Sequence, residues 1–188
     1  TLIYAFAPCL VLLANLINKP MELSINNGYT KDAKRILKSC PDLKIIGITG
    51  SYGKTSVKYY LHTLLQAKYN VLMTPESYNT PMGVVKTIRG SLKATDEIFI
   101  CEMGARWVGD IKELCDIVHP QHGVITSVGP QHLESFGSLD NVKKTKFELA
   151  DSLGTEGYLF LNGNDENIKD YGCKRPYISY TVEGDGDY

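Results

Sequence analysis

The sequence lacks a surplus of charge of either sign, because 20 lysine and arginine residues are balanced by 21 aspartate and glutamate residues. Proteins that coat DNA or RNA need a basic surplus, so this composition excludes that role and we expect no nucleic-acid partner. Low-complexity tracts and internal repeats are also absent. The chain has 188 residues, of which 43% are hydrophobic and 22% charged, and is therefore long enough and apolar enough to bury a core.

The cysteines lack any pairing pattern. They occur at positions 9, 40, 101, 115 and 173, and no two of them form a CxxC pair. This spacing argues against a disulfide scaffold and against a cysteine-based zinc site. We therefore expect small buried thiols in a protein of a reducing compartment.

Charged residues are missing from Thr1 to Ile17. This stretch is marginally short for a membrane span, which needs roughly 20 residues, and no basic segment precedes it as in a signal peptide. It is expected to be the end of a membrane helix, a helix that packs on a further domain, or part of this domain's own core. The first two are favoured equally, because the chain resembles an excerpt of a longer protein.

Asn18–Lys19–Pro20 is predicted to end this apolar stretch. Residues 18–43 are predicted to form a polar connector with one short helix that begins near Thr30. We expect residues 1–40 to be an N-terminal segment and linker. Residues 41–188 are expected to form one domain that is incomplete at its C-terminus.

Short apolar runs alternate with helical stretches between Leu43 and Leu161. The apolar runs do not alternate with polar residues, which is typical of strands buried on both faces of a parallel sheet. Strands and helices in alternation, separated by short glycine and proline turns, predict an α/β fold with a doubly wound, mostly parallel sheet. The runs and stretches are residues 43–49, 55–66, 71–73, 84–88, 98–101, 111–118, 123–128, 142–153 and 158–161.

A glycine-rich turn follows the first apolar run of this domain. The sequence from Gly47 reads GITGSYGKTS, so a predicted strand is followed by a turn and by a helix that begins at Lys54. Gly50 and Gly53 let backbone N–H groups face an anion, and the helix N-terminus adds its positive dipole. Lys54 can reach phosphates and the Thr55 hydroxyl can bind Mg²⁺, so the motif predicts a phosphate-binding loop and a sheet of the P-loop NTPase type.

A single carboxylate ends a second apolar run, Ile98 to Cys101. In a parallel sheet, Glu102 would emerge at the same edge as the phosphate loop. P-loop enzymes need an acidic residue at such a position to hold the metal ion, so we predict that Glu102 binds the metal together with Thr55.

Other polar residues are weaker candidates when they are considered singly. His132 follows the run 123–128 and would lie at the same edge, although a lone histidine is more often structural. Asn79 and Thr80 lie in the loop from Thr74 to Gly83, which follows the second predicted strand, and loops at this place often reach a nucleotide. The run of Lys143, Lys144 and Lys146 would ordinarily be a solvated helix face.

Taken together, these motifs resemble the central ATP-binding domain of the Mur ligase family. The resemblance covers residues 44 to about 165 and is carried by ITGSYGKTS (48–56), the loop 74–83, EMGA (102–105), HLESFGS (132–138) and Lys146 followed by Phe-Glu. The EMGA and HLESFGS motifs are close to the subgroup that adds D-alanyl-D-alanine to a UDP-muramoyl tripeptide. The resemblance implies a cytoplasmic ligase of peptidoglycan synthesis. The apolar residues 1–17 suggest a form tethered to the inner face of the plasma membrane.

The resemblance also implies roles for single residues. ATP would contact the phosphate loop and the residues around it, and the second Mg²⁺ would lie at His132. Lys146 matches a lysine that many members carry as a carbamate, whose oxygens suit a hard cation. Catalytic roles are implied for Lys54, His132 and Lys146. The implied cofactors are ATP and Mg²⁺, with Thr55, Glu102, His132 and carbamylated Lys146 at the metals and Thr49, Gly50, Ser51, Gly53, Lys54, Thr55, Ser56, Asn79, Thr80 and Asn162 at the nucleotide.

The activity implied is amide-bond formation through an acyl phosphate, with D-alanyl-D-alanine as the attacking amine. The family's C-terminal domain, which carries that amine, and its UDP-binding N-terminal domain lie outside this sequence. Two alternatives stay open: a related ligase on another carboxylate, such as a lipid-linked muramic or polyglutamate substrate, and a non-catalytic ATP-binding module.

Overall fold

The computed structural model describes residues 2–182 and 187, with side chains from residue 6 onward. Its centre is a six-stranded sheet with the order β2-β3-β1-β4-β5-β6, in which every neighbouring pair is parallel. This confirms the predicted α/β class and the parallel sheet. The strands are β1 (Lys44–Thr49), β2 (Val71–Met73), β3 (Ile98–Glu102), β4 (His122–Ile125), β5 (Leu159–Asn162) and β6 (Ile178–Tyr180).

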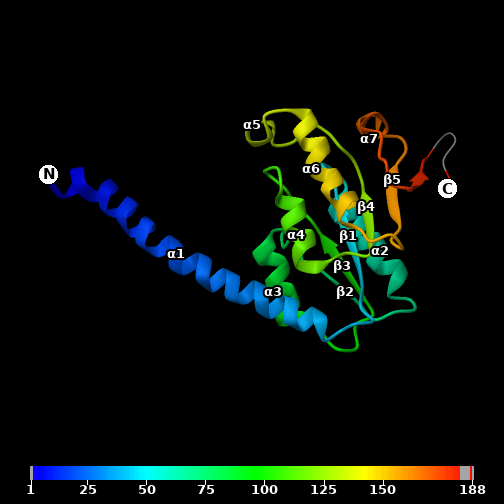
Figure 1. Ribbon diagram of the computed structural model, residues 1–188, viewed down its shortest axis with the longest axis horizontal. Helices are drawn as coiled ribbons and strands as arrows, with labels where there is room; N and C mark the ends of the chain where they lie inside the picture. The colour runs from blue at the N-terminus through cyan, green and yellow to red at the C-terminus, as the bar shows by residue number, and fades with distance from the viewer. Residues whose placement is uncertain (1, 183–186, 188) are drawn as a thin grey trace.

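Helices cover both faces of this sheet, as the buried runs required (Figure 1). On one face, α2 packs its apolar side chains against residues of β1, β3 and β4. The other face carries the larger core, which α3, α4, α6 and the end of α1 share. The helices are α1 (Leu2–Lys38), α2 (Lys54–Leu65), α3 (Pro81–Ser91), α4 (Asp110–Val118), α5 (Leu133–Phe136), α6 (Leu139–Ser152) and α7 (Glu166–Tyr171).

The register of the central strands brings three of their carboxyl ends together. Ile48 of β1 pairs with Glu102 of β3, and Thr49 pairs with Ile125 of β4. The loops that follow β1, β3 and β4 therefore lie side by side at one edge of the sheet. Ligands of open α/β sheets bind at this edge, beside a point where the strand order reverses.

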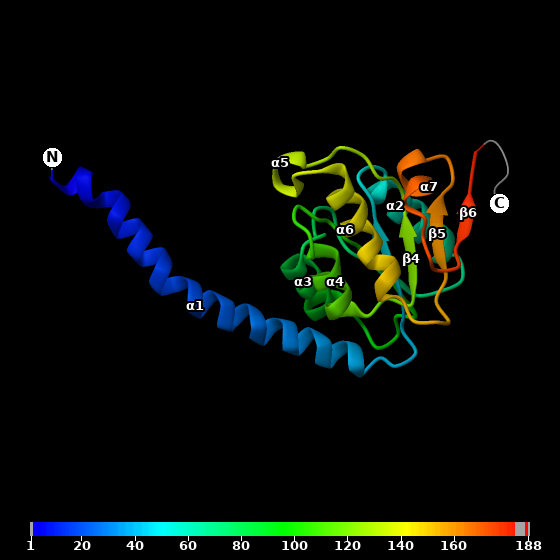
Figure 2. The same ribbon diagram turned by 45° about the horizontal axis from the view of Figure 1, so that its top comes forward.

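The N-terminal part of the chain differs from the prediction. One helix, α1, runs through Pro8 and Pro20, so the predicted break at Asn18–Lys19–Pro20 and the connector after it are wrong. A proline removes one backbone hydrogen bond and can bend a helix without ending it. Figure 2 shows α1 bent along its length and projecting away from the sheet domain.

The two halves of α1 have different environments. In the first half the apolar side chains from residue 6 onward, among them Phe6, Leu10 and Leu16, are exposed, so they do not contribute to this domain's core. In the second half Ala33 is fully buried, and Asp32 forms a 2.8 Å ion pair with Arg89 of α3. Among the residues whose side chains are described, no helix is long and apolar enough to cross a membrane. The expected membrane helix therefore gains no support there.

Two smaller boundaries also differ. The predicted loop 74–83 ends at Thr80, because Pro81 is favoured in the first turn of a helix and Thr80 caps that helix through the Gly83 N–H. The predicted strand 123–128 ends at Ile125, where the chain turns toward the phosphate loop. The sequence reading also missed α7 and β6, which are too short to give a periodic signal.

Candidate functional site

The turn after β1 has the backbone that its glycines predict. Gly50 has φ +148° and Gly53 has φ +81°, a region that residues with a Cβ rarely adopt. A Cβ on Gly50 would also collide with the Thr126 hydroxyl and lie 3.0 Å from the Ser127 nitrogen. Glycine at position 50 is therefore required by both conformation and space.

The loop after β4 holds this turn in place. The Ser51 N–H donates to the Ser127 carbonyl at 2.8 Å, and the Tyr52 N–H donates to the Ser127 hydroxyl at 2.8 Å. The Thr126 hydroxyl donates to the Tyr52 carbonyl at 2.6 Å. These bonds fix the turn before any ligand arrives, so little ordering cost remains for binding.

The N-terminus of α2 opens at the end of this turn. Gly53 is its N-cap and provides no side-chain cap, so the first N–H groups of the helix are left for another acceptor. An anion is the acceptor that suits both these N–H groups and the helix dipole. The Lys54 ammonium lies on the turn, where it donates to the carbonyl oxygens of Gly50 at 2.7 Å and Ser51 at 3.3 Å. Burial lowers the pKa of Lys54, and the charge of Glu102 opposes that shift.

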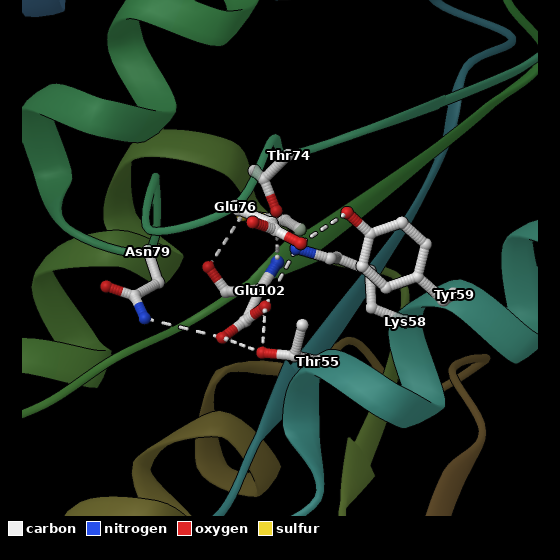
Figure 3. A network of polar contacts seen from close by, with 8 residues as sticks. Thr55, Lys58, Tyr59, Thr74, Glu76, Asn79 and Glu102 are labelled. Carbon is white, nitrogen blue, oxygen red and sulfur yellow. Dashed lines mark hydrogen bonds and ion pairs between the residues drawn. The ribbon is translucent and has the colours of Figure 1, made fainter.

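Glu102 lies opposite α2, as the strand register predicted (Figure 3). The Thr55 hydroxyl is 3.1 Å from both carboxylate oxygens, and the Asn79 amide donates to Oε1 at 3.3 Å. The Lys58 ammonium forms a 2.9 Å ion pair with Oε2, and both side chains are buried. Burial raises the pKa of Glu102, but the ion pair with Lys58 and the hydrogen bonds from Asn79 and Thr55 outweigh it and hold the pKa below its usual value.

A cavity of about 530 Å³ lies beside the phosphate loop. Its lining brings together Lys54, Asn79, Thr80, His132 and Lys146, which come from four separate segments of the sequence. The segment that joins β3 to α4 and the first residue of α4 contribute five more lining residues: Gly104, Ala105, Arg106, Trp107 and Asp110.

Lys146 enters this cavity from α6, although a lysine run on a helix usually faces solvent. Its side chain is 2% exposed. Burial, with a smaller contribution from the charge of Lys54, lowers the pKa of Lys146 to about 8. Lys146 therefore loses its proton at a lower pH than an ordinary lysine, and the uncharged amine that results is a nucleophile.

Asn162 lies elsewhere. It is the last residue of β5, and its amide donates to the Thr126 carbonyl at 3.0 Å. It lines a second cavity with residues of β6 and α7, away from the cavity that contains Lys54. Asn162 is linked to the phosphate loop through Thr126, whose hydroxyl bonds to that loop.

The oxygen-bearing side chains beside the phosphate loop determine which metal ion could bind there. Within residues 2–182 and 187, no three histidine, cysteine, aspartate or glutamate side chains converge on one point. One carboxylate and one hydroxyl, Glu102 and Thr55, do meet beside the phosphate loop. Mg²⁺ prefers oxygen ligands and is usually held by one or two carboxylates together with phosphate oxygens and water, so these residues fit Mg²⁺ bound with a nucleotide.

The comparisons with known proteins decide the family. The model of the Mur ligase middle domain matches residues 48–187. The chain belongs to the Mur ligase family. The resemblance drawn from the motifs is thereby confirmed.

Individual relatives show which members of the family this chain is similar to. The chain is 41% identical over 126 residues to the UDP-N-acetylmuramoyl-tripeptide–D-alanyl-D-alanine ligase of Mycobacterium leprae, covering 67% of this chain and 24% of that protein. It is 32% identical over 132 residues to the Bacillus subtilis ligase of the same name, covering 70% of this chain and 29% of that protein. The crystal structure of the MurF ligase from Thermotoga maritima in complex with ADP matches with a TM-score of 0.78 and 31% identity, covering 85% of this chain and 37% of that chain.

The chain thus spans about a quarter to a third of the length of these Mur ligases. The fold class that the sequence predicted, the central domain of a Mur ligase, agrees with these structures. Residues 1–47 lie outside the family match, and they include all of α1 and the first part of β1.

Sequence reasoning missed two features of this Mur ligase site. The first is Lys58, which lies one helical turn after Lys54 and was not considered as a candidate. The second is the pair Arg106 and Trp107, held by Asp110, whose carboxylate accepts their backbone N–H groups at 2.7 and 2.9 Å. The exposed Trp107 is the single tryptophan of the chain, and its place directly after the EMGA motif was the signal that could have drawn attention to this loop.

Proposed function

We propose that the full-length protein is an ATP-dependent amide ligase of peptidoglycan precursor synthesis. It would join the carboxylate of a UDP-muramoyl tripeptide to D-alanyl-D-alanine, at the expense of ATP, in the cytoplasm. The observation that carries the proposal is the phosphate loop with Lys54 at its centre and Thr55 directed at Glu102. The names of the relatives support the choice of substrates.

Activation of the carboxylate is the first step of the proposed reaction. A carboxylate oxygen attacks the γ-phosphorus, the bond to the β–γ bridging oxygen breaks, and ADP leaves with that electron pair. The free N–H groups at the start of α2 and the Lys54 ammonium hold the β- and γ-phosphates and stabilise the charge that spreads over the transferring group. Mg²⁺, when bound by Thr55 and Glu102, would neutralise further phosphate charge.

Amide formation is the second step. The amine nitrogen of D-alanyl-D-alanine attacks the carbonyl carbon of the acyl phosphate. The bond between that carbon and the oxygen that bridges to phosphorus breaks, inorganic phosphate leaves with the electron pair, and the nitrogen loses a proton. No side chain of this domain needs to act as a covalent nucleophile. The domain instead positions the two anionic reactants and excludes water from the acyl phosphate.

The charge of the cavity suits an anionic substrate. Lys54, Arg106 and Lys146 line it together with one carboxylate, Asp110, and that carboxylate is engaged by two backbone N–H groups. No side-chain partner of Arg106 occurs in the described part of the chain. We infer that Arg106 pairs with the substrate carboxylate before it attacks ATP, since a guanidinium binds a carboxylate in a fixed geometry.

Lys146 and His132 complete the proposal. The lowered pKa of Lys146 leaves an amine that can add to CO₂, and the carbamate that forms carries oxygens which suit Mg²⁺. His132 lines the same cavity and would lie at the second metal ion. Thr49, Ser51, Ser56, Asn79, Thr80 and Asn162 are proposed as residues around the nucleotide, with Asn162 acting through the Thr126 carbonyl.

Phosphate release by the full-length protein tests this function. We expect release from ATP to require both the UDP-muramoyl tripeptide and D-alanyl-D-alanine, and mass spectrometry to find the joined pentapeptide product. Release with a different carboxylate only would indicate a related ligase. ATP binding without any release in the presence of both substrates would indicate a non-catalytic module and would refute the proposal.

A further inference from the structure

Lys58 is a lysine that the reaction outlined above does not use. Its side chain is fully buried, and its ammonium forms a 2.9 Å ion pair with Oε2 of Glu102, as Figure 3 shows. The ring of Tyr59 lies 5.3 Å from the same ammonium. A lysine is rarely buried completely, because removing its charge from water is costly unless an opposite charge compensates it.

The ion pair fixes the orientation of the Glu102 carboxylate. Oε2 faces Lys58 at 2.9 Å, whereas Oε1 accepts from the Asn79 amide at 3.3 Å. The Thr55 hydroxyl stands 3.1 Å from both oxygens. The backbone of Glu102 is held as well, since its N–H donates to the Thr74 hydroxyl at 3.1 Å. The carboxylate is therefore held in one orientation, with both of its oxygens within hydrogen-bonding distance of the Thr55 hydroxyl.

The ion pair also changes the charge that an incoming cation meets. Glu102 carries one negative charge, and the adjacent Lys58 compensates it inside the protein. The Lys54 ammonium is close enough to feel the charge of Glu102. A divalent cation that arrives alone therefore meets two ammonium groups and one carboxylate, which is an unfavourable field for it. A cation that arrives bound to the anionic phosphates of a nucleotide is favoured instead, because the same ammonium groups attract those phosphates.

We propose that Lys58 is a positioning residue that holds Glu102 and neutralises it, so that the phosphate-loop site admits a divalent cation only together with a nucleoside triphosphate. This inference rests on the proposed nucleotide site. It adds an order of assembly: metal and nucleotide enter as one complex, and the nucleotide-free protein does not retain the metal.

Binding of Mn²⁺ to the full-length protein tests the proposal. Mn²⁺ is a paramagnetic substitute for Mg²⁺, and electron paramagnetic resonance measures its free concentration directly. We expect wild-type protein to bind Mn²⁺ with ATP, and to bind it at least about a hundredfold more weakly without ATP. In Lys58→Met the uncompensated carboxylate should raise the affinity for Mn²⁺ without nucleotide by at least about tenfold, since one nearby cationic charge has been removed.

Two further variants control this result. Lys112→Met removes a lysine that pairs with Asp116 on the surface, and it should leave the affinity for Mn²⁺ unchanged. The double variant Lys58→Met with Glu102→Gln removes both charges, and it should lose the gain in nucleotide-free Mn²⁺ binding. Circular dichroism and a thermal melt establish which variants fold.

The outcomes separate this inference from the proposed function. Wild-type protein that binds Mn²⁺ equally well with and without ATP overturns the role of Lys58, and this arm does not depend on any variant. A folded Lys58→Met that behaves like Lys112→Met overturns it too. Wild-type protein that binds neither ATP nor its Mn²⁺ complex overturns the nucleotide site itself, and with it the proposed function.

Discussion

Replacement of Gly50 by alanine is the substitution for which the structure gives the clearest expectation. At φ +148°, residue 50 has a backbone conformation that costs an alanine about 1–2 kcal/mol. The added Cβ also collides with the Thr126 hydroxyl and approaches the Ser127 nitrogen to 3.0 Å. Overpacking of this kind costs about 1–3 kcal/mol, because backbone atoms must shift. The total is about 2–5 kcal/mol, a large part of the ~5–15 kcal/mol that stabilises a domain.

Gly53→Ala is the matched control for this prediction. Gly53 also has a positive φ, +81°, but a Cβ there would find its nearest neighbour, Cβ of Thr126, at 3.9 Å. It should therefore lose only the conformational part, about 1–2 kcal/mol. The difference between the two variants isolates the collision with the β4 loop.

Urea unfolding of the full-length protein, followed by circular dichroism, measures both losses. Binding of ATP to Gly50→Ala should fall steeply, because the displaced loop no longer directs its N–H groups at the phosphates. A Gly50→Ala protein that is as stable as Gly53→Ala and binds ATP normally would refute the conformation and packing described for this turn.

Three other substitutions test the cavity. Lys54→Ala in the full-length protein should reduce ATP-dependent product formation by at least about a hundredfold with an unchanged circular dichroism spectrum, and near-normal turnover would contradict its assignment. The pKa of Lys146 is lowered to about 8 from an ordinary value of 10.5, so between these two pH values the unfolded chain binds more protons than the folded chain. The free energy of unfolding in CO₂-free buffer should therefore increase as pH rises from 8 to 10.5. Lys146→Met should lose that rise, and a rise that persists in it would exclude Lys146 as the cause. Arg106→Ala should raise KM for the muramoyl peptide by about tenfold or more while leaving KM for ATP unchanged, and equal effects on both would argue against a contact with the carboxylate.

The phosphate loop could be predicted from sequence because its chemistry is local. Two glycines, a lysine and a threonine follow a buried strand at fixed spacing, and each has a backbone or charge requirement that few other residues meet. Glu102 could be predicted for a related reason, since the carboxyl ends of parallel strands share one edge of the sheet. Glu102 lies near the phosphate loop because β1 and β3 are neighbours in the sheet, although the two segments are far apart in the sequence.

Lys58 could not be predicted because its partner is 44 residues further along the chain, and a lysine within a helix has no local sign of burial. Lys146 is a second example: the run of lysines around it is typical of a solvated helix face, yet this one side chain points into the cavity. In both cases tertiary packing decides the environment, and only the family resemblance gave Lys146 a role in advance.

The helix α1 shows the opposite error, in which a local signal was given too much weight. Asn18, Lys19 and Pro20 together are typical of a helix end. Strong helix formers such as Met21, Glu22 and Leu23 follow directly. The helix continues to Lys38, and Ala33 within its second half is buried. The docking of its second half on α3, through Asp32 and Arg89, is a tertiary contact with no signature in either segment.

Calorimetric titration of the full-length protein with ATP and Mg²⁺ tests the central claim most directly. The structure predicts one nucleotide bound per chain, binding that requires Mg²⁺ for full affinity, and loss of most of that affinity in Thr55→Val and Glu102→Gln variants that remain folded. Heat signals that are absent for wild-type protein, or that are identical for wild-type protein and both variants, would contradict the assignment of this loop as the nucleotide site.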